Sequence, residues 1–396
     1  MPAPRPWGRT LQSADVVIIG GGVIGLASGY WLAKAGAKVV ILEKGRLASE
    51  ASGRATGFLS LRGEQPLEAA LAVAAEELWT NLDEELGYPT EWTPGGRLWV
   101  ALEEDRWVEL RDLCPQWQAA GIRVQFVGGK AAREIAPCLS ERTLGGLYTT
   151  RGGHANPQRT SQAFAWAFRD RGGDIRENSP AVGIRVQDGR VAAVETPGGS
   201  IATRRIVNCA GPQTGLIAAM VGVQVPMAPV RLEAMVTAPL PRLFDVAMVG
   251  HGLSLRQTRR GNIHFNGGPH EWIDVDATSE PAKPSTPIVR NIARRLAELM
   301  PSIANVHALR SWAGIVEVTP DQTCIIERVP SPEGMIIATA SGHGFGLAPS
   351  IGKAICGLVL EGRSPIPIDG LGLERFAALD PDWRAARGWT AGAYNT

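Results

Sequence analysis

Three glycines near the start of the chain have the spacing that lets a backbone turn contact a phosphate group. Gly20, Gly22 and Gly25 fill the pattern G-x-G-x-x-G directly after the β-branched run at residues 15–19. In such a pattern the first glycine permits a tight turn and the second lets main chain approach a pyrophosphate. The third lets a helix pack on a strand. These residue types and spacings predict a strand, a phosphate-binding turn and a helix.

An acidic residue follows where the ribose of an adenosine would lie. Glu43 closes the second apolar run, "KVVILE", and its carboxylate can accept hydrogen bonds from ribose hydroxyls. The same carboxylate would repel the 2′-phosphate of NADP. The helix between the two runs begins with Val23 and Ile24, whose N–H groups belong to the predicted phosphate site. We therefore expect a dinucleotide without a 2′-phosphate.

The residues after Glu43 favour FAD over a nicotinamide dinucleotide. The stretch "KGRLASEASGRATGFLS", residues 44–60, is rich in small residues and carries Arg46 and Arg54 where a nicotinamide domain would continue with a helix. Such a loop suits an extended dinucleotide whose second half runs past main chain. The residues expected to contact it are Lys44, Ser52, Arg54, Ala55, Thr56 and Gly57.

Three later stretches resemble one family of flavoproteins, in the order in which that family has them. They are "RRIVNCAGPQT" at 204–214, "RSWAGIVEVTPDQTCII" at 310–326 and "ASGHGFGLAPSIGKAI" at 340–355. With the N-terminal pattern, they make the chain similar to the amine and D-amino-acid oxidase family of FAD enzymes, which includes glycine oxidase and sarcosine oxidase. The last stretch is most similar to the β subunits of heteromeric proline, hydroxyproline and opine dehydrogenases.

The resemblance implies an α/β fold with two interleaved domains. A Rossmann-like FAD-binding domain would be discontinuous, and an antiparallel-sheet α+β substrate domain would cover the flavin. The predicted FAD-binding segments are 1–62, 146–219 and 310–396, and the predicted substrate-binding segments are 63–145 and 220–309. In this fold the strand predicted at 333–339 returns beside the first strand of the chain.

The resemblance also places the loop 341–346 across the edge of the flavin ring. Its glycines let main chain approach a flat ring without Cβ clashes. A helix predicted from Pro349 to Leu360 would direct its positive N-terminal end at the N1–C2=O edge, which gains negative charge on reduction. The other FAD contacts implied by the family pattern are Val182, Gly211, Gly314, Gly342, His343, Gly344, Phe345 and Gly346.

The candidates for the chemistry itself are His264, His343, Arg62 and Arg256. Arginine is the natural anchor for a substrate carboxylate because its planar fork binds both oxygens. Glycine oxidase-like members carry an arginine after the "WAG" triplet, where this chain has Val316, and sarcosine oxidases carry a lysine where it has Gly346. Arg62 and Arg256 are the substitutes. A purely structural role remains open for each of the four candidates.

Two missing side chains bear on the electron acceptor and on flavin attachment. Oxidases of the family place a lysine above the flavin to speed reaction with oxygen, and this chain has His264 on the corresponding strand. That favours a dehydrogenase. Sarcosine oxidases attach the flavin through a cysteine where this chain has Gly314, and residues 44–60 contain no histidine. We therefore expect non-covalent FAD, with attachment at Cys324 as the alternative.

Composition excludes several other classes of protein. The formal net charge of +1 gives no basic field for nucleic acid or an anionic membrane. The five cysteines are scattered without metal-ligand spacing, which indicates a reduced, cytoplasmic protein without a metal site. Residues 16–33 carry no charge, but consecutive glycines at 20–22 favour strand, turn and helix over a transmembrane segment. Arginine far outnumbers lysine, which is typical of a GC-rich bacterial genome.

The function that these features favour is oxidation of the C–N bond of an amino acid or secondary amine. The substrate would be a D-amino acid, an imino acid or an opine-like compound, and hydride transfer to flavin N5 would give an imine. A self-sufficient oxidase that makes hydrogen peroxide is the first alternative. A non-catalytic flavin-binding assembly protein is the second. Partner redox subunits or a homo-oligomer are the expected assemblies.

Overall fold

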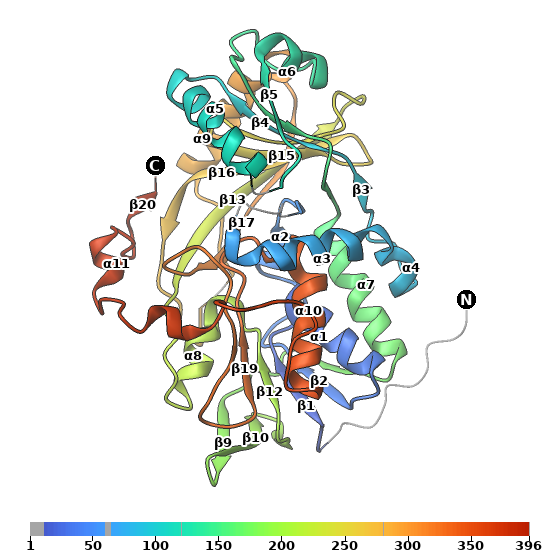
Figure 1. The fold of residues 1–396 in the computed structure, drawn as a ribbon, viewed down its shortest axis with the longest axis vertical. Helices are drawn as coiled ribbons and strands as arrows, with labels where there is room; N and C mark the ends of the chain where they lie inside the picture. The colour runs from blue at the N-terminus through green and yellow to red at the C-terminus, as the bar shows by residue number, and fades with distance from the viewer. Residues whose placement is uncertain (1–11, 60–64, 120, 280, 396) are drawn as a thin grey trace.

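The apolar runs at the start of the chain form adjacent parallel strands of a six-stranded sheet (Figure 1). The computed structural model describes residues 12–59, 65–119, 121–279 and 281–395. It orders this sheet β18-β19-β12-β1-β2-β8, and every neighbouring pair is parallel except β18 with β19. The strands are β1 (Val16–Ile19), β2 (Val39–Leu42), β8 (Asp174–Arg176), β12 (Ile206–Asn208), β18 (Ile326–Arg328) and β19 (Met335–Ala338).

Both faces of this sheet are covered, which is why its strands are apolar without alternation. Val16 and Ile18 of β1 pack with helix residues on one face, and Val17 and Ile19 pack with a three-stranded sheet on the other. The helices are α1 (Val23–Lys34), α3 (Ala69–Thr80), α7 (Pro157–Asp170) and α10 (Gly344–Leu360). The small sheet contains β9 (Gly183–Gln187), β10 (Arg190–Thr196) and β11 (Gly199–Ala202).

Two local expectations need correction. The strand β19 joins the sheet as predicted, but it pairs with β12, which separates it from β1. Helix α10 begins at Gly344 instead of Pro349, so the glycine-rich loop supplies its first turn. Proline is favoured in a first turn, but here Pro349 lies inside the helix. Two tryptophans bind main-chain carbonyl oxygens near the start of α10. The indole N–H of Trp79 donates to the carbonyl oxygen of Gly346 (2.8 Å), and that of Trp31 donates to the carbonyl oxygen of Pro349 (3.2 Å).

A nine-stranded, mostly antiparallel sheet forms the other half of the molecule. Its order is β17-β13-β16-β15-β14-β4-β6-β5, with β20 paired to β16, and only the pair β14 and β4 is parallel. The strands are β4 (Arg97–Ala101), β5 (Gln125–Gly128), β6 (Gly145–Thr149), β13 (Ala228–Pro239), β14 (Ala247–Gly250), β15 (Leu253–Gln257), β16 (Asn262–Trp272), β17 (Ala308–Val318) and β20 (Tyr394–Asn395). The predicted α/β class, with a parallel sheet and a mostly antiparallel one, is confirmed.

The two faces of the large sheet have different neighbours. On one face Phe265 and Leu255 pack against α9 (Thr286–Leu299) and α6 (Gly129–Ile135). The other face is turned toward the six-stranded sheet, and α5 (Glu104–Ala119) covers only one end of it. The remaining helices are α2 (Ala51–Arg54), α4 (Leu82–Leu86), α8 (Thr214–Ala219) and α11 (Trp383–Ala386), and β3 (Thr93–Pro94) pairs with β7 (Gly153–His154).

The proposed domain boundaries at 146 and 310 fall on strands of the large sheet, because β6 and β17 both belong to it. The C-terminal segment also returns to this sheet, where Trp389 stacks on Trp272 with ring centroids 4.3 Å apart. Within the described ranges, the helices are all too short or too polar to cross a membrane. The same residues contain no group of three potential metal ligands.

Candidate functional site

A cavity of about 880 Å³ lies between the two sheets. It is lined from one side by the turn after β1, by the stretch 42–59 and by the loop 340–345. From the other side it is lined by strands of the large sheet, and at its far end by α5. Ligand pockets usually have volumes of roughly 300–1,000 Å³, so this one has room for a large ligand.

The three fingerprint glycines are required for two different reasons. Gly20 has a φ of +113°, and a Cβ there would lie 2.2 Å from the carbonyl oxygen of Cys209. A Cβ on Gly25 would lie 2.0 Å from the carbonyl oxygen of Gly20. On Gly22, which lines the cavity, the only described atom within 4 Å of such a Cβ is Oγ of Ser52, at 3.0 Å. Packing therefore requires the first and third glycines, whereas the middle one keeps open a space that a ligand can use.

Two of the longer helices begin at this cavity. α1 has Gly22 as its N-cap and α10 has His343, and neither cap makes a side-chain hydrogen bond to its helix. The first N–H groups of a helix have no partner within the helix, and the helix dipole makes this end positive. Of these groups in α1, Val23 N donates to Oγ of Ser52 at 2.9 Å. The cavity is therefore suited to the phosphates and the electron-rich edge of an anionic ligand.

The acidic residue predicted to bind ribose has its carboxylate fixed by main chain. Oε2 of Glu43 accepts from Gly21 N at 2.8 Å, and Oε1 accepts from Gly45 N at 2.8 Å. Both oxygens retain lone pairs for hydroxyl groups. Glu43 and Lys44 line the cavity, as does Val182, a residue that is 56% exposed.

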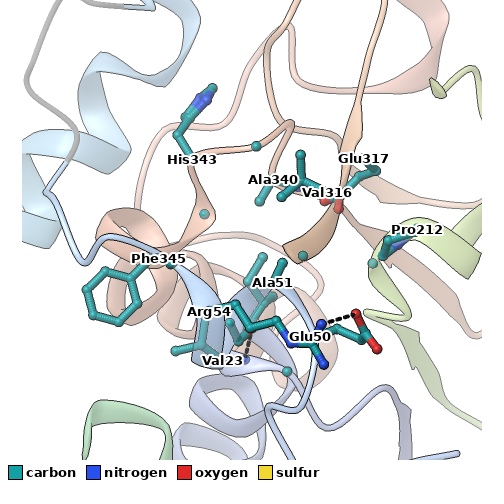
Figure 2. Close-up of a pocket in the computed structure, with 18 of the residues that line it drawn as sticks. Val23, Glu50, Ala51, Arg54, Pro212, Val316, Glu317, Ala340, His343 and Phe345 are labelled. Carbon is teal, nitrogen blue, oxygen red and sulfur yellow. Dashed lines mark hydrogen bonds and ion pairs between the residues drawn. The ribbon is translucent and has the colours of Figure 1, made fainter. Parts of the chain in front are cut away.

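The stretch 44–59 is held against the large sheet by Arg54. Its guanidinium donates to the carbonyl oxygens of Ala313 and, at 3.2 Å, of Ala282, and its Nη1 lies 3.9 Å from a carboxylate oxygen of Glu50 (Figure 2). In return, the indole N–H of Trp312 donates to the carbonyl oxygen of Arg54 at 3.1 Å. Instead of a plain loop, this stretch contains the short helix α2. These bonds fix one wall of the cavity.

The "TPD" stretch shapes the loop at the start of α10. Ser341, with a φ of 46°, accepts a hydrogen bond through Oγ from Thr319 N at 3.0 Å, and the two hydroxyls lie 2.9 Å apart. Oε1 of Glu317 accepts from Ala340 N at 2.9 Å. Glu317 lines the cavity, and burial raises the pKa of its carboxyl group. Figure 2 shows Glu317 and His343 on either side of Ala340.

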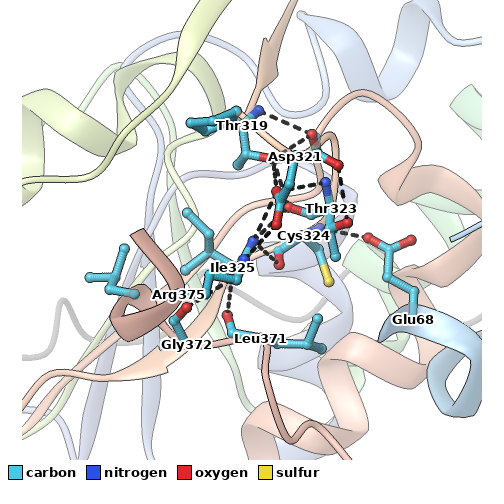
Figure 3. A network of polar contacts seen from close by, with 12 residues as sticks. Glu68, Thr319, Asp321, Thr323, Cys324, Ile325, Leu371, Gly372 and Arg375 are labelled. Atoms are coloured by element: carbon cyan, nitrogen blue, oxygen red, sulfur yellow. Dashed lines mark hydrogen bonds and ion pairs between the residues drawn. The ribbon is translucent and has the colours of Figure 1, made fainter. Parts of the chain in front are cut away.

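A second network holds the segment 319–325, which is bonded to this loop through Thr319 (Figure 3). Arg375 binds Asp321 and donates to the carbonyl oxygens of Thr323 and Cys324, each at 3.0 Å. The N–H of Cys324 donates to Oε1 of Glu68 at 2.6 Å. Burial and the nearby Glu68 hold the pKa of the Cys324 thiol well above its usual value, so this thiol is not a reactive nucleophile.

Most of the predicted cofactor contacts line this one cavity. The residues that do so are Gly20, Gly22, Val23, Ile24, Glu43, Lys44, Ser52, Arg54, Ala55, Thr56, Gly57, Val182, Gly211, Gly314, Gly342, His343, Gly344 and Phe345. Gly25 and Gly346 do not; their roles are in packing and in the hydrogen bond from Trp79. Arg62 lies outside the described residues.

The structure places His264 and Arg256 behind the cavity wall. They face each other on β16 and β15, and neither lines the cavity. Nε of Arg256 donates to the carbonyl oxygen of Thr56, so this arginine supports the stretch 44–59, and its burial lowers its pKa to about 10. The His264 ring lies 5.0 Å from the Trp312 ring. Burial, with Arg256 and Arg310 nearby, holds the pKa of His264 well below its ordinary value.

Several cavity residues were not foreseen from the sequence. Glu68 binds His343, while Asn266, Ser254 and Trp99 line the cavity from the large sheet. The two-residue alternation along β16 and β15 places Asn266 on the same face as His264, and Ser254 on the same face as Arg256. Whether Asn266 and Ser254 face a ligand, or His264 and Arg256 do, depends on which neighbouring elements cover the sheet at each point. A single sequence does not give the positions of those elements.

Comparison with known families identifies the ligand. The profile of the DAO family, described as FAD dependent oxidoreductase, matches residues 15–358. The chain belongs to this family of FAD-dependent oxidoreductases. The predicted resemblance is thereby confirmed, and the protein is a family enzyme of the amino-acid and amine oxidase or dehydrogenase type.

Relatives and solved structures are similar to this oxidoreductase over most of its length. Sarcosine oxidase subunit beta of Rhodobacter capsulatus is 29% identical over 373 residues, covering 91% of this chain and 88% of that protein. Glycine oxidase of Geobacillus kaustophilus is 31% identical over 362 residues, covering 87% and 92%. Its crystal structure has a TM-score of 0.85 at 26% identity, covering 91% and 98%. L-proline dehydrogenase from P. horikoshii shares the fold, with a TM-score of 0.83 at 24% identity, covering 96% and 99%.

The cavity of this oxidoreductase fits FAD. The space beside Gly22 and the N-terminus of α1 suit a pyrophosphate, and the carboxylate of Glu43 suits a ribose. The N-terminus of α10 suits a flavin edge that becomes negative on reduction.

Proposed function

We propose that this enzyme oxidises the C–N bond of an amino acid or secondary amine to an imine, which water then hydrolyses to a carbonyl compound. The substrate class is a D-amino acid, an imino acid or an opine-like amine. The observation that carries this proposal is the continuity of the cavity. One space runs from the phosphate-binding turn at Gly22, past the loop at Gly342, to the face of the large sheet at Asn266. A substrate on that face would lie against the ring end of a bound flavin.

The protein's own part in such a reaction is positioning and proton handling. Bound FAD supplies the hydride acceptor. The α1 start and Glu43 hold its adenosine half, while the loop 340–345 and the α10 start hold its ring. His343, hydrogen-bonded to Glu68 at the cavity, is the residue we assign to take the proton that a protonated amine must lose.

Anaerobic reduction of the flavin tests this function. Purified protein is mixed without oxygen with secondary amines, D-amino acids, imino acids and opines, and flavin absorbance is followed. We expect at least one class to bleach the flavin within seconds. If none does, although dithionite bleaches it fully, the alternative of a non-catalytic flavin-binding protein replaces this proposal.

We propose a dehydrogenase, with an oxidase as the alternative. The resemblance places the lysine of family oxidases at residue 264, but the histidine here lies outside the cavity and burial lowers its pKa, so residue 264 offers no positive charge to assist reduction of oxygen. After anaerobic bleaching, an artificial dye should therefore restore the flavin colour quickly and air slowly. Reoxidation by air within the enzyme's own turnover time would favour the oxidase.

We propose that FAD is bound without a covalent link. Gly314 stands at the cavity where a cysteine would be needed, and Cys324 is fully buried and does not line the cavity. Heat or acid should release all the flavin into the supernatant. Flavin retained in the washed precipitate would contradict this.

We also propose that a partner subunit takes part. The sarcosine oxidase relative is itself named as a β subunit. Co-purification from the source organism, followed by size measurement, tests for a heteromer. A chain that is isolated alone with full dye-coupled activity would favour the homo-oligomer.

A further inference from the structure

Six side chains form one transverse row across the cavity face of the large sheet. Strand register pairs Trp312 with Ala234, Ala234 with Asn266, Asn266 with Ser254, Ser254 with Val249 and Val249 with Trp99. All six line the cavity. Residues directly opposite each other point to the same face, and neighbouring strands are about 4.8 Å apart, so the row is roughly 24 Å long.

The two ends of the row have different surroundings. Trp312 donates to the carbonyl oxygen of Arg54 at 3.1 Å, which joins this end to the cofactor-binding stretch. At the other end, the Trp99 ring lies 4.8 Å from the ring of Trp117 on α5, in a T-shaped contact. Trp117 and Leu113 of α5 also line the cavity. The row therefore runs from the cofactor to a wall formed by α5.

Polarity changes along the row. The middle is polar and roomy, because Ala234 is small and Asn266 and Ser254 carry an amide and a hydroxyl. Oδ1 of Asn266 is buried and has no hydrogen-bond partner among the described residues. An unpartnered buried oxygen is costly unless a ligand or water binds it. The α5 end, with Val249, Trp99 and Leu113, is apolar.

We infer that this row is the substrate-binding surface and that the natural substrate carries an apolar group of several carbons. The Asn266 amide and the Ser254 hydroxyl bind the polar head of the substrate. The apolar group occupies the compartment bounded by Val249, Trp99 and Leu113. The inference rests on the proposed function and narrows it to amino acids or secondary amines with an alkyl or aryl substituent, in place of glycine or sarcosine.

The choice of an apolar group follows from the charges at that end. Arg106 of α5 lines the cavity, but its side chain is 34% exposed and is paired with Glu109 at 2.7 Å. Arg97 of β4 also lines the cavity, and its guanidinium lies 5.3 Å from the centre of the Trp99 ring, but it donates to the carbonyl oxygen of Leu59 in the stretch 44–59. A positively charged substituent would be repelled by these two arginines, and a negatively charged one would find both already engaged, whereas an alkyl or aryl group gains by leaving water.

Binding of two ethers tests the compartment without turnover. Benzyloxyacetate and methoxyacetate have an oxygen in place of the amine nitrogen of N-benzylglycine and sarcosine. Their affinities for the purified holoenzyme are read from changes in the flavin spectrum. We expect benzyloxyacetate to bind roughly tenfold or more tightly than methoxyacetate, because the phenyl ring leaves water. Equal affinities would overturn the inference.

Two variants locate the effect. Val249→Phe and Leu113→Phe fill the compartment from opposite walls, and each should reduce the preference to about twofold or less. Asn266→Leu should weaken both ethers by a similar factor, on the order of tenfold. The control is Val108→Phe, because Val108 lies on α5 but does not line the cavity. A preference that persists in both filled variants would contradict the assignment.

A parallel measurement separates this inference from the proposed function. Anaerobic bleaching is followed with sarcosine and with N-benzylglycine. If sarcosine bleaches the flavin as fast as N-benzylglycine at equal concentration, the function stands and the compartment assignment fails. If the ether preference is present but no amine bleaches the flavin, the compartment stands and the proposed reaction fails.

Discussion

Nε2 of His343 lies 2.7 Å from Oε2 of Glu68, a residue 275 positions earlier in the chain. Glu68 is 2% exposed, and its other oxygen accepts the N–H of Cys324. One buried carboxylate thus joins the segment before α3 to His343, the N-cap of α10, and to the main chain at Cys324. The start of α10, which we assign to the flavin ring, depends on this carboxylate for its position.

Glu68→Ala should therefore weaken FAD binding and the fold together. Losing both hydrogen bonds leaves the Cys324 N–H without a partner, and we expect the unfolding free energy to fall by about 1–3 kcal/mol. The dissociation constant of FAD should rise by about tenfold. Reconstitution of the apoprotein with FAD, followed by fluorescence, measures the second effect. Glu77→Ala, on the exposed side of α3, is the control and should change neither.

Gly22→Val tests the phosphate-binding turn. The added side chain meets only Ser52 at close range among the described residues, so the fold should survive while the space for the pyrophosphate is filled. We expect colourless protein with a circular dichroism spectrum like that of the unaltered protein. Gly45→Val is the matched control, because its Cβ would have ordinary contacts and Gly45 does not line the cavity. Normal flavin content in Gly22→Val would refute the assignment of this turn.

His154 should make the fold sensitive to acid. It is 2% exposed, neither ring nitrogen has a hydrogen-bond partner among the described residues, and burial beside Arg256, Arg242 and Arg259 lowers its pKa to about 3. Between pH 6.5 and pH 3 the unfolded chain binds a proton at this site and the folded chain does not. Stability contributed by neutral His154 is therefore present above the unfolded pKa and is lost as the pH falls.

Replacing this histidine should remove that loss. In His154→Leu, the slope of unfolding free energy against pH should fall by about 1.4 kcal/mol per pH unit within this range. Urea unfolding at a series of pH values measures the slope. His307→Leu, at an exposed position, should leave it unchanged. An unchanged slope in His154→Leu would mean that His154 is protonated in the folded protein.

His264→Lys tests whether residue 264 faces the flavin, as the sequence suggested, or is buried outside the cavity, as in the structure. If residue 264 faced the flavin, a lysine there should speed reoxidation by air. The structure buries the site next to Arg256 and Arg310, so a lysine charge would have no partner and two positive neighbours. We expect a loss of about 3 kcal/mol or more in stability and no faster reoxidation. Melting temperature and stopped-flow reoxidation check this against the neutral variant His264→Gln.

The dinucleotide-binding turn could be predicted from the sequence because its parts are local. Gly20, Gly22, Gly25 and Glu43 belong to one strand–turn–helix–strand unit, in which spacing along the chain fixes position in space. The loop at Gly342 was predictable only through its resemblance to a family, since its partners Thr319 and Glu68 lie far away in sequence.

The substrate side could not be predicted in the same way. Arg256 and Asn266 both lie on strands of the large sheet, but one supports Thr56 and the other lines the cavity. The difference depends on cross-strand register and on where the other sheet packs. Neither the register between strands nor the packing of the two sheets can be read from the alternation of residues along one strand. Glu68 could not be predicted either, because the histidine that it binds lies 275 residues away and the sequence around Glu68 carries no pattern that indicates this contact.

The position of β19 has a consequence for biosynthesis. The cavity that we assign to the cofactor is lined by the turn after β1, the end of β12 and the loop after β19, and the last of these is complete only near residue 345. A ribosome must therefore release the chain through about residue 345 before this site is complete. Until β19 has been made, the edge of β12 that faces away from β1 has no strand paired to it. Contacts between segments so distant in sequence also form slowly. FAD can stabilise only chains that contain all of these segments, so cellular flavin supply should govern how much newly made protein survives.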